Sequence, residues 1–169
     1  MKRNLFKWAL YTAIAVLFVT VETRFLPWLR VRGASPTFGA ALTAAVAMFE
    51  GGTGGAFFGL ACGALCYLDP AGGETVYMLV YMFGGYACGV LCRELFRRTF
   101  AAALLWTLFI TAAATVVYLL FVVALARRAA PTSLFLSAAA SIGMNTAMAA
   151  LVWLPVRRVA RSFHPEEES

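Results

Sequence analysis

The feature that most constrains this chain is a 32-residue stretch, residues 37–68, in which Glu50 is the only charged residue. As one helix it would be about 48 Å long at about 1.5 Å per residue, well beyond a hydrocarbon thickness of about 30 Å. Two glycine pairs, Gly51-Gly52 and Gly54-Gly55, follow directly after Glu50. Because paired glycines mark turns, we predict two short helices that turn at the glycine pairs.

The composition of the whole chain requires contact with lipid. Hydrophobic residues make up 62% of the 169 residues and charged residues 13%, whereas soluble domains have about 45–50% and about 25%. Six spans of roughly 20 residues would use about 120 residues and leave no room for an extramembrane domain. These numbers exclude a soluble enzyme, a nucleic-acid binder and a transporter with its own nucleotide-binding domain. The predicted fold is therefore an all-α polytopic membrane protein, with one six-helix domain over residues 1–161 and a polar cytoplasmic tail over 162–169.

The remaining spans follow from apolar runs and their breaks. Lys2, Arg3 and Lys7 precede a first run that resembles a signal peptide, but no small-x-small cleavage site follows it, so we expect a retained helix. Pro155 and the arginines after it are expected to end the last helix. The predicted helices outside the long stretch are residues 8–21 (extending toward Trp28), 75–92, 100–126 and 132–154.

Basic residues predict the orientation. With six spans and the N-terminus inside, nine basic residues lie inside and five outside, which places both termini in the cytoplasm. A five-span chain with its N-terminus outside gives the same count, so length and the glycine pairs, and not charge, favour six spans. The inner set is Lys2, Arg3, Lys7, Arg93, Arg97, Arg98, Arg157, Arg158 and Arg161, and the outer set is Arg24, Arg30, Arg32, Arg127 and Arg128.

Glycines at a spacing of four residues form a ladder on one predicted helix face, and a second pair repeats the spacing further along the chain. Glycine on a helix face lets another backbone approach closely. The ladder indicates either packing among the protein's own helices or a docking face for a partner. The ladder glycines are Gly51, Gly55, Gly59 and Gly63, and the second pair is Gly85 and Gly89.

Three polar residues within apolar segments form a possible intramembrane site: Glu50, Asn145 and Ser141. Such residues mark ligand or transport sites, or they hydrogen-bond neighbouring helices. We favour the hydrogen-bonding role because it is the more frequent one for such residues. Paired carboxylates within one span are absent from the sequence, which argues against a proton-relay pump.

We predict no catalytic, cofactor-binding or metal-binding residue. His164 is the only histidine and lies in the polar tail, and residues 51–55 lack the lysine of a phosphate-binding loop. Four cysteines suggest a metal site, but we expect their two pairs at different depths, whereas a zinc ion needs all four sulfurs at about 2.3 Å. Buried packing is the better explanation. The cysteines are Cys62, Cys66, Cys88 and Cys92.

The order of these features resembles the bacterial rod shape-determining protein MreD family. The resemblance covers most of residues 8–160 and rests on glycine, proline and aromatic positions. Thr37 stands where the family commonly has Asp. The segments that carry the resemblance are TRFLP (23–27), Ser35-Pro36, FEG (49–51), GAFFGL (55–60) with Gly63, YMFGGY (81–86) with Gly89, and Asn145 with WLPVRR (153–158).

The resemblance implies a non-enzymatic scaffold in the bacterial inner membrane that belongs to the cell-elongation machinery. Its partners would be MreC, the actin-like MreB filament and the glycosyltransferase–transpeptidase pair that builds lateral peptidoglycan. An alternative is the substrate-binding membrane subunit of an energy-coupling-factor vitamin transporter, whose fold is similar to that of MreD-like proteins. A small channel is a third alternative, but the sequence has no ring of charges and no filter-like segment.

Overall fold

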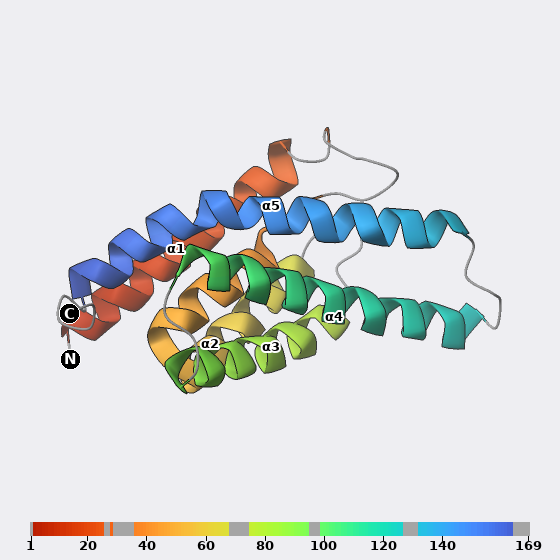
Figure 1. Ribbon diagram of the computed structural model, residues 1–169. Helices are drawn as coiled ribbons and strands as arrows, with labels where there is room; N and C mark the ends of the chain where they lie inside the picture. The colour runs from red at the N-terminus through yellow and green to blue at the C-terminus, as the bar shows by residue number, and fades with distance from the viewer. Residues whose placement is uncertain are drawn as a thin grey trace.

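The computed structural model describes residues 2–25, 28, 36–67, 75–94, 99–126 and 132–163. Each described segment longer than one residue contains one α-helix (Figure 1). The helices are α1 (Lys2–Phe25), α2 (Gly39–Tyr67), α3 (Thr75–Glu94), α4 (Phe100–Ala126) and α5 (Thr132–Phe163).

Four of the five helices are long and apolar enough to cross a membrane, namely α1, α2, α4 and α5. The apolar part of α3, Met78–Arg93, is shorter. The prediction of an all-helical chain is thereby confirmed, and four of its helices could span a membrane by their length and composition. The predicted number of six spans depends on how α2 is counted, because α2 consists of two helical arms.

Gly51 divides α2 into a first arm, residues 39–50, and a second arm, residues 52–67. Its backbone angles, φ 79° and ψ −175°, are non-helical, and this region of φ/ψ space is open almost only to glycine. The second arm folds back on the first. A Cβ atom built on Gly59 of the second arm would lie 3.0 Å from Thr43 Cγ2 of the first arm. In a straight helix these residues would be about 24 Å apart. The predicted turn at the glycine pairs is therefore confirmed, and Gly51 makes it.

The first arm of α2 lies at the centre of the molecule. Every residue from 38 to 49 is buried, and the most exposed of them, Phe49, has 9% of its surface exposed. Alanine is frequent in this arm, and its small side chain lets neighbouring helices approach closely. Phe18 of α1 stacks on Phe38 with ring centroids 4.8 Å apart, and Phe49 packs 5.5 Å from Trp153 of α5.

Glycines hold the second arm of α2 against α3. A Cβ at Gly59 would collide with the backbone carbonyl of Tyr81, and a Cβ at Gly85 would collide with that of Gly55. Gly89 likewise lies against the backbone of Gly51. The second arm and α3 are therefore antiparallel, and their backbones are so close that no side chain fits between them at these glycines. Of the two roles predicted for the glycine ladder, this is packing among the protein's own helices. Gly63 is buried on the same arm.

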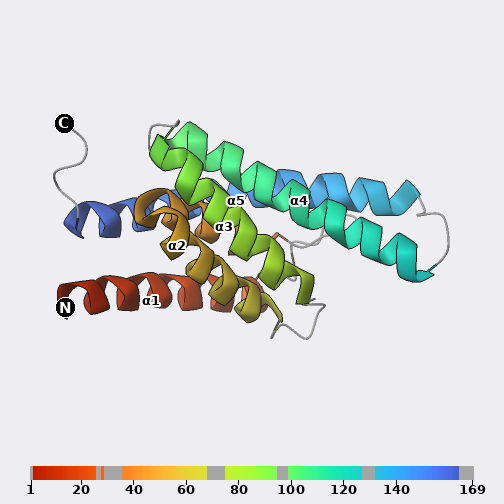
Figure 2. The same cartoon turned by 90° about the horizontal axis from the view of Figure 1, so that it is seen from below.

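The other three helices surround this core (Figures 1 and 2). α4 and α5 are antiparallel and both contact α2, and α1 lies beside α2 and α5. Rings from three elements meet near the kink, since Phe100 of α4 also packs against Trp153, at 6.3 Å. The start of α1 lies beside the end of α5, where Phe6 and Phe163 have ring centroids 6.2 Å apart.

Two predicted helix boundaries were wrong. α1 begins at Lys2 instead of residue 8, because its first turns pack against the end of α5. α5 continues through Pro155 to Phe163, although proline removes one backbone hydrogen bond. Burial of Val156 and Ala160, with 0% and 1% of their surfaces exposed, holds the last turns in place. Residues 162 and 163, expected in the tail, thus belong to α5.

Several sequence predictions fall on residues that the structure does not describe. They are the turn at 69–74, the loop at 29–35, the basic residues Arg97, Arg98, Arg127 and Arg128, and the tail at 164–169.

The glycine packing predicts opposite effects of the same substitution at two positions. Gly59→Ala forces the second arm away from α3 and is expected to lower stability by about 1–3 kcal/mol. Gly143→Ala on α5 is the control, because its Cβ meets nothing within 4 Å, so it should raise stability by roughly 0.5–1 kcal/mol. Thermal unfolding in detergent measures both. Equal effects of the two substitutions would contradict the close packing.

Candidate functional site

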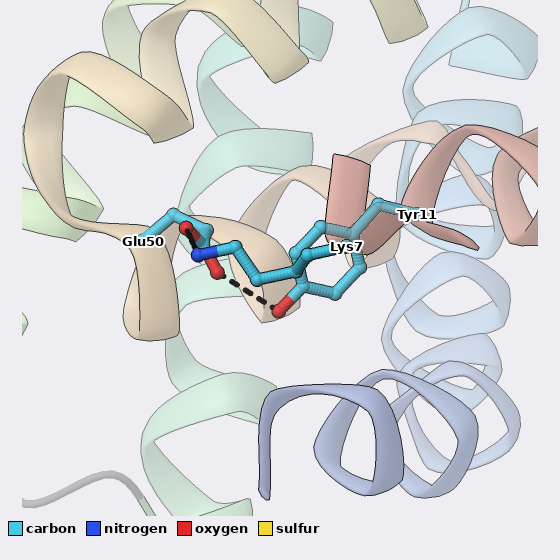
Figure 3. A network of polar contacts seen from close by, with 3 residues as sticks. All are labelled: Lys7, Tyr11 and Glu50. Atoms are coloured by element: carbon cyan, nitrogen blue, oxygen red, sulfur yellow. Dashed lines mark hydrogen bonds and ion pairs between the residues drawn. The ribbon is translucent and has the colours of Figure 1, made fainter. Parts of the chain in front are cut away.

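A buried network of three polar side chains lies at the kink of α2. Glu50, the last residue of the first arm, accepts a hydrogen bond from Lys7 Nζ at 2.6 Å and another from the Tyr11 hydroxyl at 3.0 Å (Figure 3). The Lys7 and Glu50 side chains have 8% and 7% of their surfaces exposed. We call Lys7, Tyr11 and Glu50 the kink clamp.

The kink clamp exists because of spacing on α1. Lys7 and Tyr11 are four residues apart, so their side chains share one face of that helix, and this face is turned toward the kink (Figure 3). Trp8 lies beside them and its ring packs against Gly54, where an added Cβ atom would be 3.5 Å from the ring. Each buried charge has its counter-charge, which is the condition for placing either one in an apolar interior. The clamp therefore ties the start of α1 to the turn in α2.

A second group of polar contacts holds the other end of the first arm. Glu22 Oε2 of α1 accepts a hydrogen bond from the backbone N–H of Phe38 at 2.8 Å, and Asn145 Oδ1 of α5 accepts one from that of Thr37 at 2.7 Å. Backbone N–H groups at a helix start have no partner within the helix. A carboxylate there also interacts favourably with the helix dipole. We call Glu22 and Asn145 the start clamp.

The structure separates the polar residues that the sequence suggested as one site. Glu50 lies at the kink, whereas Asn145 lies at the opposite end of the first arm, about 18 Å away along a helix of this length. Ser141 stays with Asn145, whose Nδ2 donates a hydrogen bond to Ser141 Oγ at 3.5 Å. The three residues therefore act in two places. Glu50 bonds two side chains of α1, whereas Asn145 bonds the backbone just before α2 and Ser141 of its own helix.

Sequence reasoning missed Lys7, Tyr11 and Glu22 as members of these clamps. Lys7 was assigned only to the basic N-terminal segment, and Glu22 was noted only as part of the residues that follow the first apolar run. A usable signal was present, because Glu22 and Glu50 are the only acidic residues before Asp69. Ionisable residues in such apolar surroundings need a partner.

The three cysteines whose side chains the structure describes pack in the core, and the side chain of Cys66 lies outside the described part. Cys62, Cys88 and Cys92 are buried with at most 2% of their surfaces exposed. Cys88 Sγ lies 3.6 Å from the Ala44 carbonyl and 3.9 Å from Cys92 Sγ. Among the described side chains, no group of three or more His, Cys, Asp and Glu residues has a geometry that would hold a metal ion.

No protein-family model, curated protein or solved structure matches this chain. The resemblance to MreD proteins therefore rests on the glycine, proline and aromatic positions quoted from the sequence.

The kink clamp predicts strong coupling between Lys7 and Glu50. Lys7→Met leaves a buried carboxylate without its counter-charge and should lower stability by about 3–5 kcal/mol. The double variant Lys7→Met/Glu50→Leu removes both charges and should recover most of that loss. Arg24→Met, which removes an exposed charge of the same helix, should change stability by no more than about 0.5 kcal/mol. Additive losses in the double variant, measured by unfolding in detergent, would rule out the clamp.

The start clamp predicts a local effect. Asn145→Leu leaves the Thr37 N–H without its acceptor and should cost about 1–3 kcal/mol. Amide hydrogen exchange should accelerate at residues 37–42 and remain unchanged in α4. Thr146→Val is the matched control, because the Thr146 hydroxyl bonds the Ile142 carbonyl of its own helix. Unaltered exchange at residues 37–42 in the Asn145 variant would show that this contact does not hold the helix start.

Proposed function

We propose that this protein is a non-enzymatic scaffold of the bacterial inner membrane, similar to MreD, that takes part in lateral peptidoglycan synthesis and in the regulation of cell shape. One observation carries the proposal. The polar residues that would mark a binding or transport site are used in two separate clamps around a buried helix arm. The contacts with other molecules are then left to the outer helix faces.

The outer faces offer wide apolar surfaces to lipid and to partner helices. Large hydrophobic side chains are exposed on every helix. Examples are Leu17 of α1, Phe57 of α2, Phe83 of α3, Phe109 of α4 and Leu151 of α5, each with more than half of its surface exposed. Helices that associate in lipid do so by packing such faces. The proposed partners are MreC and the glycosyltransferase–transpeptidase pair within the membrane, with MreB at its cytoplasmic side.

The proposed topology has six crossings and both termini in the cytoplasm. Contacts between elements support it, because α1, the two arms of α2, α3, α4 and α5 alternate in direction. Three contacts bring six segment ends to one end of the bundle, namely the starts of α1, α4 and the second arm of α2 and the ends of α3, α5 and the first arm. The contacts are Phe6 with Phe163, Phe100 with Trp153 and Gly89 with Gly51. We call this the basic end, since its described basic side chains are Lys7, Arg93, Arg157, Arg158 and Arg161. Positive charge is enriched on the cytoplasmic side of membrane proteins.

The vitamin-transporter alternative keeps one observation in its favour. Ala9 and Ala13 are both exposed on α1, and small residues at this spacing suit close helix docking. The residue that would bind a vitamin in that alternative is Asn145. Its side-chain oxygen already accepts the Thr37 N–H, which favours the scaffold.

Crosslinking in native membranes tests the proposal. An affinity tag on the C-terminal tail of the full chain is used to isolate crosslinked complexes, whose components are identified by mass spectrometry. We expect MreC and wall-synthesis enzymes, because the exposed helix faces are the surfaces left for partners. Recovery of an ATPase-coupled membrane module instead would reject the scaffold and establish the transporter subunit.

A further inference from the structure

The start of α1 and the end of α5 project together beyond the other helices at the basic end. In both views the two helix ends extend further than α2, α3 and α4 (Figures 1 and 2). The contact between Phe6 and Phe163, with ring centroids 6.2 Å apart, joins them near the tip. The projection is therefore a two-helix unit and not a single unsupported helix end.

Helix length places this projection at the membrane surface. α5 has 32 residues, which corresponds to about 48 Å and exceeds the hydrocarbon thickness of about 30 Å. If the apolar stretch from residue 135 to 154 fills the hydrocarbon layer, the last two turns lie among the lipid headgroups. These turns contain Arg157, Arg158 and Arg161.

The surface of the projection combines positive charge with apolar side chains. Arg158 and Arg161 are exposed and lie three residues apart, hence on one face of α5. Leu5, Phe6 and Leu154 are also exposed, with 67%, 61% and 61% of their surfaces accessible. The sequence has no acidic residue in 2–21 or in 95–165, and the acids that adjoin these ranges are Glu22, Glu94 and Glu166.

We propose that this projection binds the headgroups of anionic phospholipids. Arginine pairs with phosphate through two parallel hydrogen bonds, and each basic residue near an anionic leaflet contributes about 1 kcal/mol. The exposed leucines and phenylalanine favour a lipid over an acidic protein, because they would enter the acyl boundary beside the headgroups. The inference goes beyond the proposed scaffold function and does not depend on it, since it rests only on the projection and its charges.

Lipid titration of the full chain in a neutral detergent tests this inference. Native mass spectrometry compares phosphatidylglycerol with phosphatidylcholine. We expect preferential binding of phosphatidylglycerol, and Arg158→Gln/Arg161→Gln should weaken it about tenfold or more, because two charges of about 1 kcal/mol each are lost. Phosphatidylcholine binding should stay unchanged.

The matched control is Arg24→Gln, which removes an exposed arginine from the opposite end of α1 and should leave phosphatidylglycerol binding as in the unmodified chain. Equal phosphatidylglycerol binding by the double variant and the unmodified chain would overturn the proposal. The proposal would also be overturned if a polyglutamate peptide displaced the lipid when both are present at the same concentration of negative charge. That result would identify the arginines as a site for acidic proteins.

Discussion

A helix that starts or ends within an apolar layer must have its terminal backbone groups and side chains paired by other parts of the protein. The first arm of α2 is such a helix, because its length of about 18 Å is less than a hydrocarbon thickness of about 30 Å, so one of its ends lies inside the layer. Glu22 and Asn145 accept the N–H groups at its start, and Lys7 and Tyr11 bind the carboxylate at its end. The positions of α1 and α5 follow from this requirement.

The same constraint explains why small residues dominate the centre of the molecule. The buried arm has neighbours on all sides, and its turn at Gly51 needs a positive φ of 79°. Gly55, Gly59 and Gly85 then let the second arm and α3 pack directly on one another. The ladder face is consequently filled by the protein itself, and the outer helix faces, with their exposed hydrophobic side chains, are the surfaces left for other molecules.

Most of the fold was predictable, because long apolar runs and glycine pairs depend on local sequence. The turn after Glu50 followed from these signals, as did the helices predicted at residues 75–92 and 100–126, which the structure has at Thr75–Glu94 and Phe100–Ala126. The passage of α5 through Pro155 was not predictable, since it depends on burial of Val156 and Ala160 against distant elements. The clamps were missed for the same reason: Lys7 and Glu50 are 43 residues apart. Sequence periodicity shows which residues lie on the same face of a helix, but not which other helix that face contacts.

The distance across the turn in α2 tests the central claim most directly. Spin labels at Thr37→Cys and Ala64→Cys, in a chain whose native cysteines are replaced by alanine, can be measured by double electron–electron resonance in lipid bilayers. Antiparallel arms, with axes about 8–10 Å apart, predict a separation of about 10–20 Å. An uninterrupted helix would place the labelled residues about 40 Å apart. The shorter distance is the expected result, and the longer one would contradict the buried, clamped arm.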